Sequence, residues 1–233
     1  MARNAGKLPV GAPVPGWTPR PAPPATAMAG RTCRVEPLDP DAHGPALWRA
    51  FSVPEAAPVW TYLGYGPFES EADYRARLAA FAAGTDPLFF AIVEAGSGAP
   101  RGLASFLRID PANGVVEIGH ICLAPALQRT PAATEAIALM LGRVFDDLGY
   151  RRCEWKCDAL NAASRRAAVR FGFTFEGVFR QAAVVKGRNR DTAWYAMLDR
   201  EWPARKARLA AWLDPSNFDA AGRQRRALSA FPP

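Results

Sequence analysis

Apolar residues alternate with polar ones, or gather in short runs, at seven places along the chain, and each place predicts a strand. The predicted strands cover residues 32–38, 88–94, 102–109, 115–123, 152–158, 173–185 and 189–198. Only the turn-forming residues 110–114 separate the predicted strands at 102–109 and 115–123, so these two strands should be antiparallel neighbours. In the strand at 152–158, the period of two puts Cys153, Trp155 and Cys157 on one face and charged residues on the other.

Helices are predicted where apolar residues recur every three or four positions. The predicted helices cover residues 41–51, 70–83, 130–149, 161–171 and 200–213. Ser70, Thr130 and Asn161 are typical N-caps at the start of three of them, and Gly149 and Gly172 are typical of helix ends.

The order of these elements defines the expected fold class. Consecutive strands in the middle of the chain predict an antiparallel meander, whereas the strand–helix–strand step between residues 115 and 158 predicts a parallel pair. We therefore expect an α/β fold with a mixed, mostly antiparallel central sheet of about seven strands and helices on both faces. Residues 31–213 would form this domain. Residues 1–30, rich in proline, predict an extended or disordered arm, and residues 214–233 predict a tail.

The composition fits a globular protein, because 49% of the 233 residues are hydrophobic and 22% are charged. The net charge of +7 is typical either of an arginine-rich solvated surface or of a protein that binds anions. Nucleic acid is not the expected anion, because basic runs such as residues 223–226 are short and contain no aromatic residue. A phosphate-rich small molecule would need only a few of these charges.

The chain's four cysteines form no Cys-x-x-Cys pair, and it has only two histidines. Buried apolar packing is the favoured interpretation of Cys33, Cys122, Cys153 and Cys157, and no metal site is expected. The sequence contains neither an apolar run of about 18 residues nor a signal-peptide pattern. We therefore expect no membrane partner and a cytoplasmic, reducing location.

The segment from Cys122 to Glu135 is the strongest candidate for a ligand site. It ends a predicted strand, turns, and opens directly into a predicted helix, whose first N–H groups lack internal partners and favour negative charge. Arg129 adds a positive charge, and Ala132 and Ala133 are small enough to let a phosphate approach the backbone. An ordinary helix start with a surface arginine is the alternative interpretation of the same residues.

Residues 128–133, Gln-Arg-Thr-Pro-Ala-Ala, resemble the pyrophosphate loop of the GNAT N-acetyltransferases, which is written Gln/Arg-x-x-Gly-x-Gly/Ala. Pro131 stands at the first glycine position, and a proline lacks the N–H that would bind a phosphate there. Gln-Arg-Thr-Pro at this place resembles a branch of the family that acetylates ribosomal-protein N-termini and related amines. The resemblance implies acetyl-CoA as co-substrate.

A second motif supports this resemblance. Asn161, Ser164 and the Arg170-Phe-Gly-Phe sequence resemble the Asn-x-x-Ser…Lys-x-Gly-Phe helix of the same family, with Arg170 at the lysine position. In the family the Asn contacts the pantetheine arm, and the Ser lies near the coenzyme sulfur, where it can protonate the leaving thiolate. A helix cap and a first-turn polar residue are the alternatives for Asn161 and Ser164. The resemblance extends over residues 31–213 and implies these cofactor-binding residues: Cys122, Leu123, Gln128, Arg129, Thr130, Ala132, Ala133, Asn161, Ser164 and Arg170.

Acetyl transfer to an amine needs a group that takes the amine proton and a donor for the thioester oxygen. The resemblance implies that the N–H of Leu123 or its neighbour is this donor and that Ser164 is the catalytic acid. Glu117 is the preferred base, directly or through water, although an ion pair with an arginine would explain it equally well. Asp158 and His120 are the alternative bases. Regular alternation puts Glu117 and His120 on opposite faces of their strand. Direct attack needs no covalent enzyme intermediate, so no cysteine is expected to act as a nucleophile.

Trp60, Tyr62 and Tyr65 are the candidates for binding the acceptor. They lie in the aromatic, glycine-punctuated residues 59–68, where a loop is predicted and where the family places acceptor-binding elements. Core packing is the alternative. The expected acceptor is a primary amine on a small molecule or a protein N-terminus, and a homodimer is left open. Two rival functions are a catalytically silent acyl-CoA-binding protein of the same fold and a ribosome- or nucleic-acid-associated protein.

Overall fold

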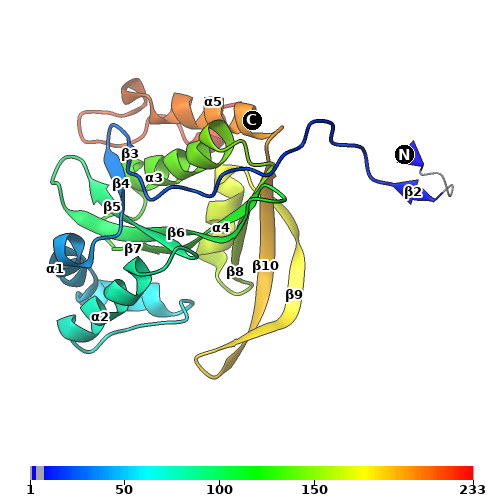
Figure 1. Cartoon of the computed structure of the whole chain (residues 1–233). Coiled ribbons are helices and arrows are strands. Elements are labelled where there is room, and N and C mark those ends of the chain that lie inside the picture. Colours follow the sequence, from blue (N-terminus) through cyan, green and yellow to red (C-terminus); the bar gives the residue numbers. More distant parts are fainter. Residues whose placement is uncertain (1, 4–7, 233) are drawn as a thin grey trace.

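The computed structural model describes residues 2–3 and 8–232. Within them, one sheet of eight strands runs through the molecule in the order β3-β4-β5-β6-β7-β8-β10-β9 (Figure 1). All its pairings are antiparallel except the one between β7 and β8. Its strands are β3 (Met28–Ala29), β4 (Cys33–Pro37), β5 (Leu88–Glu94), β6 (Pro100–Asp110), β7 (Val115–Leu123), β8 (Arg152–Asp158), β9 (Thr174–Val185) and β10 (Arg188–Leu198). A separate antiparallel pair joins β1 (Ala2–Arg3) and β2 (Pro9–Val10).

Helices cover both faces of this sheet, as the sequence predicts (Figure 1). One face carries α1 (Pro40–Phe51), the 3-10 helix η1 (Pro54–Trp60) and α2 (Glu71–Ala82); the other carries α3 (Pro131–Gly142), α4 (Ala162–Phe171) and α5 (Trp202–Leu213). The π-helical segment η2 (Arg143–Asp147) continues α3, and the short 3-10 helices η3 (Pro215–Asn217) and η4 (Leu228–Ala230) follow α5. The expected mixed, mostly antiparallel fold is thus confirmed, with β3 added at the sheet edge.

The predicted helix boundaries are set by N-cap side chains at the starts and by glycines at the ends. Ser70, Thr130 and Asn161 each accept the backbone N–H three residues further along the chain. Gly149 and Gly172 have φ angles of 65° and 98°, in the left-handed region that favours glycine. Of these five residues, Thr130 and Asn161 begin the helices that follow β7 and β8.

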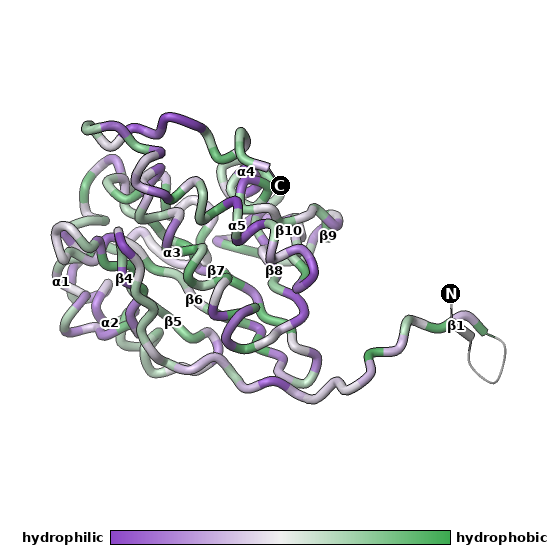
Figure 2. Tube along the Cα trace, turned by 90° about the horizontal axis from the view of Figure 1, so that it is seen from above, coloured by the Kyte–Doolittle hydropathy of each residue, from purple (hydrophilic) through white to green (hydrophobic). Residues whose placement is uncertain are grey.

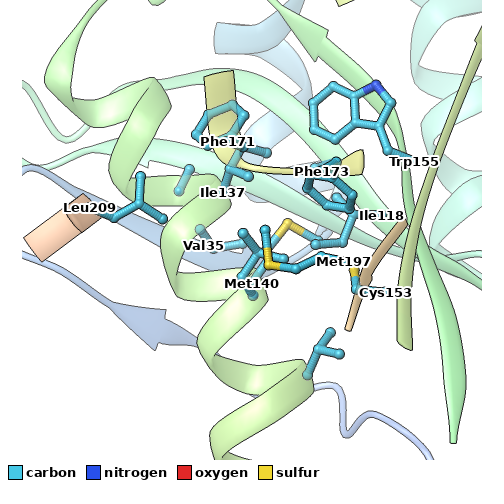
Figure 3. Packing of buried hydrophobic residues seen from close by; sticks show 14 of the residues in the cluster. Val35, Ile118, Ile137, Met140, Cys153, Trp155, Phe171, Phe173, Met197 and Leu209 are labelled. Atoms are coloured by element: carbon cyan, nitrogen blue, oxygen red, sulfur yellow. The ribbon is translucent and has the colours of Figure 1, made fainter. Parts of the chain in front are cut away.

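Two hydrophobic cores hold the layers together. The larger lies between the sheet and α3, α4 and α5, where side chains from the helices meet side chains from the strands (Figure 3). Figure 3 shows this contact for Ile137, Met140, Phe171 and Leu209 on the helices and for Val35, Ile118, Cys153, Trp155 and Met197 on the strands. The smaller core, under α1 and α2, is rich in aromatic rings such as Phe51, Trp60, Tyr74 and Phe89.

The N-terminal residues leave the body of the protein as an extended segment (Figures 1 and 2). Residues 8–16 are exposed, and the first contacts with the domain are made by Trp17, whose Nε1 donates to the carbonyl of Ala112 at 2.9 Å. Further on, the hydroxyl of Tyr150 donates to the carbonyl of Pro21 at 3.1 Å. Of the described helices, none is both long and apolar enough to cross a membrane.

Candidate active site

The central feature of the site is the point where β7 and β8 separate. The two strands pair only at their first residues, from Val115 with Arg152 to Glu117 with Glu154. Beyond that point, residues 118–123 and 155–158 have no mutual pairing, although β7 stays paired with β6 and β8 with β10. We call this unpaired stretch the splay. It exposes backbone groups of a central strand at the place where the predicted ligand segment begins.

A β-bulge lies within the splay and corrects one prediction. Leu103 and Ser105 are two positions apart on β6, whereas their partners Cys122 and Gly119 are three positions apart on β7. The extra residue is His120, whose φ of 49° lies in the left-handed region. Its ring packs on Phe89 of the smaller core, with 4.9 Å between the ring centroids.

Glu117 points to the same face of the sheet. Its neighbours Val116 and Ile118 point into the larger core, so Glu117 points to the opposite face, where the smaller core lies. Glu117 and His120 therefore share a face, and the prediction of opposite faces was wrong because no sequence signal marks the bulge.

The backbone of Leu123 faces the splay. The N–H of the next residue, Ala124, donates to the carbonyl of Arg101 on the β6 side, at 2.9 Å. Alternation along a strand therefore directs the N–H and C=O of Leu123 the other way, toward β8. The side-chain amide of Gln128 donates to the Leu123 carbonyl at 2.9 Å and fixes this end of the strand to the following loop. The Leu123 N–H is left as a donor aimed into the splay.

The loop between β7 and α3 presents further bare donors. Thr130 caps α3 by accepting the N–H of Ala133 at 3.2 Å, and its own hydroxyl donates to the Leu127 carbonyl at 2.7 Å. Within the described chain, the N–H groups of Arg129 and Ala132 donate no hydrogen bond. Arg129 has a φ of 62° and an exposed side chain. Two backbone donors, a guanidinium and the positive end of a helix dipole thus converge at the start of α3, as an anionic ligand requires.

Asn161 and Ser164 lie on the β8 side of the splay. The Asn161 Oδ1 accepts the Ser164 N–H at 3.0 Å, which leaves the Nδ2 group of this cap available to a ligand. The Ser164 hydroxyl accepts the indole N–H of Trp155 at 2.9 Å and lies against the thiol of Cys157. Burial raises the pKa of Cys157, and the hydrogen bond from Ser164 opposes the rise. The Ser164 hydroxyl is therefore fixed beside β8, on the face covered by α3 and α4.

Three arginines gather where α4 and α5 meet the start of α3. Arg170 donates to the hydroxyl of Thr134 in the first turn of α3, at 3.2 Å, and its guanidinium lies 4.8 Å from the ring centre of Trp212. Arg208 donates to the backbone carbonyl of Arg170 at 3.3 Å. Burial lowers the pKa of Arg170 and of Arg208, and in each case a neighbouring arginine, Arg208 or Arg205, lowers it further. None of the three forms an ion pair with a carboxylate of the described residues, so the cluster has unbalanced positive charge.

Glu117 is buried, with only 4% of its surface exposed, and two cations hold it. Arg108 donates to its carboxylate at 2.5 Å, and the Lys156 ammonium lies 3.1 Å away. Lys156 is also paired with Glu154 at 2.7 Å and lies 3.8 Å from the ring centre of Trp194. The sequence left open an ion pair for Glu117, and the structure has one. A proton that Glu117 accepts must therefore compete with Arg108 and Lys156 for its carboxylate.

The three aromatic candidates of the acceptor side occupy different environments. Trp60 is 4% exposed and packs inside the smaller core, which leaves little ring surface for a ligand. The Tyr62 hydroxyl donates to the carbonyl of Leu160 at 3.2 Å and so connects this loop to the segment between β8 and α4. Tyr65 stacks on His120, with 5.7 Å between ring centroids. Only Tyr62 and Tyr65 therefore reach the elements that form the splay.

The remaining candidate chemistry is limited. Cys122 is fully buried, and this burial strongly raises the pKa of its thiol. The raised pKa favours the neutral thiol over a nucleophilic thiolate. Across the described residues, no three histidine, cysteine, aspartate or glutamate side chains gather as metal ligands would. Sequence reasoning missed Arg108, Lys156, Arg190 and Trp194, whose only sequence signal is alternation along β6, β8 and β10.

Comparison with known proteins agrees with this geometry. The acetyltransferase (GNAT) domain model matches residues 34–174, and the chain therefore belongs to the GNAT acetyltransferase family. A GCN5-related N-acetyltransferase from Brucella melitensis is 51% identical, with a TM-score of 0.91, over 93% of this chain and 98% of that chain.

Two further relatives have names that refer to ribosomal acetyltransferases. The Bacillus subtilis (strain 168) protein YdaF, provisionally named a ribosomal N-acetyltransferase, is 30% identical over 117 residues, or 49% of this chain. The match spans 63% of the length of YdaF. RimL, described as a ribosomal L7/L12 alpha-N-protein acetyltransferase in complex with coenzyme A, has a TM-score of 0.63 over 74% of this chain and 98% of its own. Its identity of 23% limits that likeness to the fold.

Proposed function

We propose that this protein transfers an acetyl group from acetyl-CoA to a primary amine, on a small molecule or a protein N-terminus, by direct attack in a ternary complex. One observation carries the proposal: the splay of β7 and β8 meets the bare N–H groups of Arg129 and Ala132 at the start of α3. A thioester in the splay and a pyrophosphate on the helix start fit these donors. The name of YdaF, a ribosomal N-acetyltransferase, supports a protein N-terminus among the acceptors.

The coenzyme when bound would supply the acetyl thioester, and the residues of this chain would hold and polarise it. In the proposal, the N–H of Leu123 donates to the thioester oxygen as negative charge develops there. The Ser164 hydroxyl gives a proton to the departing sulfur. Gln128, Arg129 and Ala132 hold the phosphates, and the Asn161 amide holds the pantetheine arm.

The amine must lose a proton to attack, and Glu117 is proposed to receive it through water. Its contacts with Arg108 and Lys156 also favour the rival function, a silent acyl-CoA-binding protein, because they occupy the carboxylate. The Glu117→Gln variant separates the two roles. If Glu117 acts as the base, its replacement should lower kcat by about 100-fold. The matched control is Glu154→Gln, which also removes a carboxylate partner of Lys156 but leaves the Glu117 carboxylate in place. Equal losses in both variants would assign Glu117 a structural role.

Activity is tested by incubating the protein with acetyl-CoA and a panel of primary amines and measuring free coenzyme A. Release that depends on an added amine supports the proposal, whereas release with none of the amines would favour the silent alternative. Binding is tested separately: saturating acetyl-CoA should raise Tm by several degrees, because a ligand at about 100 times its Kd stabilises the folded state by about 2.7 kcal/mol. Arg129→Glu should reduce this shift, and no shift for the wild type at millimolar acetyl-CoA would contradict the proposal.

A second copy of the chain is proposed as a partner along β9. This edge strand is exposed over nearly its whole length and carries Val178, Phe179 and Val184, which are 40%, 56% and 79% exposed. Open edges with apolar side chains favour pairing with another strand. Sedimentation equilibrium should detect a dimer, and Val184→Lys should weaken it; a monomer at micromolar concentration would refute this part.

A further inference from the structure

Arg190 stands at the open end of the splay. β10 pairs with β8 up to Thr192 opposite Asp158, the last residue of β8. Arg190 therefore lies two residues beyond the end of β8. The β10–β9 pairing shifts register between Arg190 and Thr192, with the extra residues on β9, so that alternation along β10 keeps Arg190 on the face of Thr192 and Trp194. That face also bears Lys156, whose ammonium contacts the Trp194 ring. Register thus places the start of the Arg190 side chain just beyond the end of β8, one of the two strands that form the splay.

The electrostatic influence of Arg190 reaches both strands of the splay. On β7, burial lowers the pKa of His120 to about 4, and the charges of Arg108 and Arg190 contribute to the decrease. On β8, burial raises the pKa of Cys157, while the hydrogen bond from Ser164 and the charge of Arg190 oppose that rise. His120 on β7 and Cys157 on β8 thus both respond to the charge of Arg190.

The positive charge of Arg190 is not balanced by its surroundings. The neighbouring network balances itself, because the cations Arg108, Lys156 and Arg152 are paired with the anions Glu117, Glu154 and Glu176. Within the described chain, Arg190 forms no ion pair within 4.0 Å and donates no side-chain hydrogen bond. Two carboxylates stand close to Arg190 in the chain and in the register, and both have other donors. Asp191 accepts the N–H of Gln181 at 2.8 Å and the side-chain amide of Asn189 at 2.9 Å, and Asp158 accepts the N–H of Leu160 at 2.8 Å.

Other donors near this point also lack acceptors. The Nε atom of Arg190, the indole N–H of Trp194 and the hydroxyl of Tyr65 are buried and have no hydrogen-bond partner among the described residues. Tyr65 reaches the splay through its stacking on His120. Buried donors without acceptors are costly, and an incoming group with several acceptor oxygens would remove this cost.

We propose that Arg190 binds a carboxylate of the acceptor, so that the preferred substrates are amines that carry a carboxylate close to the reacting nitrogen. A guanidinium can hold a carboxylate through two parallel hydrogen bonds, which fixes the orientation of the amine as well as its position. The unbalanced charge of Arg190 also disfavours polyamines, whose second cation would lie beside it. The carboxylate can be that of a free amino acid or of an acidic side chain that follows a peptide N-terminus. This inference rests on the proposed function.

The test compares acceptors that differ only in this carboxylate, with release of coenzyme A as the measurement. The pairs are serine with serinamide, and the dipeptide amides Ser-Asp-NH2 with Ser-Asn-NH2; spermidine is the polyamine. In at least one pair, the wild type should prefer the acid at least tenfold in kcat/KM. The pair that shows the preference identifies the source of the carboxylate.

Arg190→Gln should remove this preference by raising KM for the acid at least tenfold, without changing kcat for the amide. Arg190→Lys keeps the charge but loses the two-pronged geometry, so it should restore only part of the preference. The matched control is Arg49→Gln on the exposed side of α1, which makes the same change in net charge away from the splay and should behave as the wild type. Melting curves with acetyl-CoA verify that each variant is folded and binds the coenzyme.

The outcomes are distinguishable. Equal rates with both members of every pair, or faster reaction of spermidine, would overturn the role of Arg190 while leaving the acetyltransferase proposal intact. A loss in Arg190→Gln that is equal for acids and amides would show that the residue is merely structural, and so would also overturn the inference. Absence of coenzyme A release with every amine would refute the proposed function and this inference together.

Discussion

At the scale of single residues, the Ser164 hydroxyl has a position that suits an acid. It is held by the Trp155 indole of β8, and the Leu123 N–H belongs to β7, the other strand of the splay. Ser164→Ala should lower kcat by about 100-fold, because a positioned general acid contributes a factor of about 100 or more. The rise in Tm caused by acetyl-CoA should stay nearly unchanged.

The control for this prediction is Ser164→Thr, which keeps a hydroxyl at the same position of α4. Both variants are compared with the wild type by steady-state kinetics and by melting curves with and without acetyl-CoA. If the alanine and threonine variants turn over equally fast, the hydroxyl has no part in the chemistry. If instead the Tm shift disappears in Ser164→Ala, its role is in binding.

His120 gives a prediction for the pH dependence of stability. Burial lowers its pKa from 6.5 to about 4 in the folded protein. Between these two values the unfolded chain binds a proton that the folded protein does not, so stability falls as the pH falls through this window. At pH 4.5 this should cost the wild type roughly 2–3 kcal/mol relative to pH 7, at 1.36 kcal/mol per pKa unit.

His120→Gln should therefore lose less stability than the wild type between pH 7 and pH 4.5. Urea unfolding at the two pH values measures the difference directly. Since both proteins keep every other titrating group, their difference isolates His120. Parallel losses in the two proteins would mean that the imidazole is protonated as easily in the folded protein as in the unfolded chain.

At the scale of elements, α5 extends the predicted coenzyme site beyond the loop. Arg170 contacts the first turn of α3, where the pyrophosphate is proposed to bind, and Arg208 contacts the Arg170 carbonyl. Neither these two nor Arg205 has a carboxylate partner among the described residues. A second phosphate of the coenzyme would balance this charge. Arg208→Gln should therefore weaken binding of coenzyme A about tenfold, in line with loss of a charge-assisted hydrogen bond.

Dephospho-coenzyme A, which lacks the 3′-phosphate, is the informative ligand for this element. The wild type should bind it less tightly than coenzyme A, and Arg208→Gln should reduce that difference, as isothermal titration can measure. Arg200→Gln, in the exposed turn before α5, serves as the control. A wild type that binds both ligands equally would show that the arginine cluster does not contact the 3′-phosphate.

Most elements could be predicted from the sequence, because their signals are local. The strands at Leu88–Glu94, Val115–Leu123 and Arg152–Asp158 match the predicted residues, since turn-forming residues bound each apolar run. Segments that depend on distant partners were missed. β3 has only two residues and exists through its pairing with β4, and the π-helical end of the long helix has no sequence mark.

The candidate site divides in the same way. Its loop is visible in the sequence because a strand end, a cap and a helix start follow one another. The His120 bulge and the arrangement around Arg190 are not visible, because both depend on register between strands. Arg190 follows the hairpin turn at Lys186 and Gly187, in a run of charged residues that resembles a solvated surface. Only the pairing of β10 with β8 brings it to the splay.

At the scale of the whole molecule, the N-terminal segment divides into two parts with different expected roles. Residues 8–16 are exposed. From Trp17 onward the chain is attached to the domain: the guanidinium of Arg151 lies 5.3 Å from the Trp17 ring centre, Tyr150 donates to Pro21, and Met28 is 6% exposed in the larger core. The domain therefore depends on residues that precede the predicted boundary at residue 31.

Two truncations test this dependence. Removal of residues 1–16 should leave Tm within about one degree of the wild type, because surface changes away from packed features cost little. Removal of residues 1–27 also takes away Trp17 and the carbonyl that Tyr150 contacts, and should cost at least about 2 kcal/mol, or roughly 4–8 °C in Tm. Because the first truncation is the control for the second, the comparison separates the attached segment from the exposed one. Equal melting temperatures would mean that the folded domain needs no residue before Met28. A large loss of Tm on removal of residues 1–16 would instead mean that the exposed part makes a stabilising contact. The second copy proposed at β9 is the available partner for such a contact.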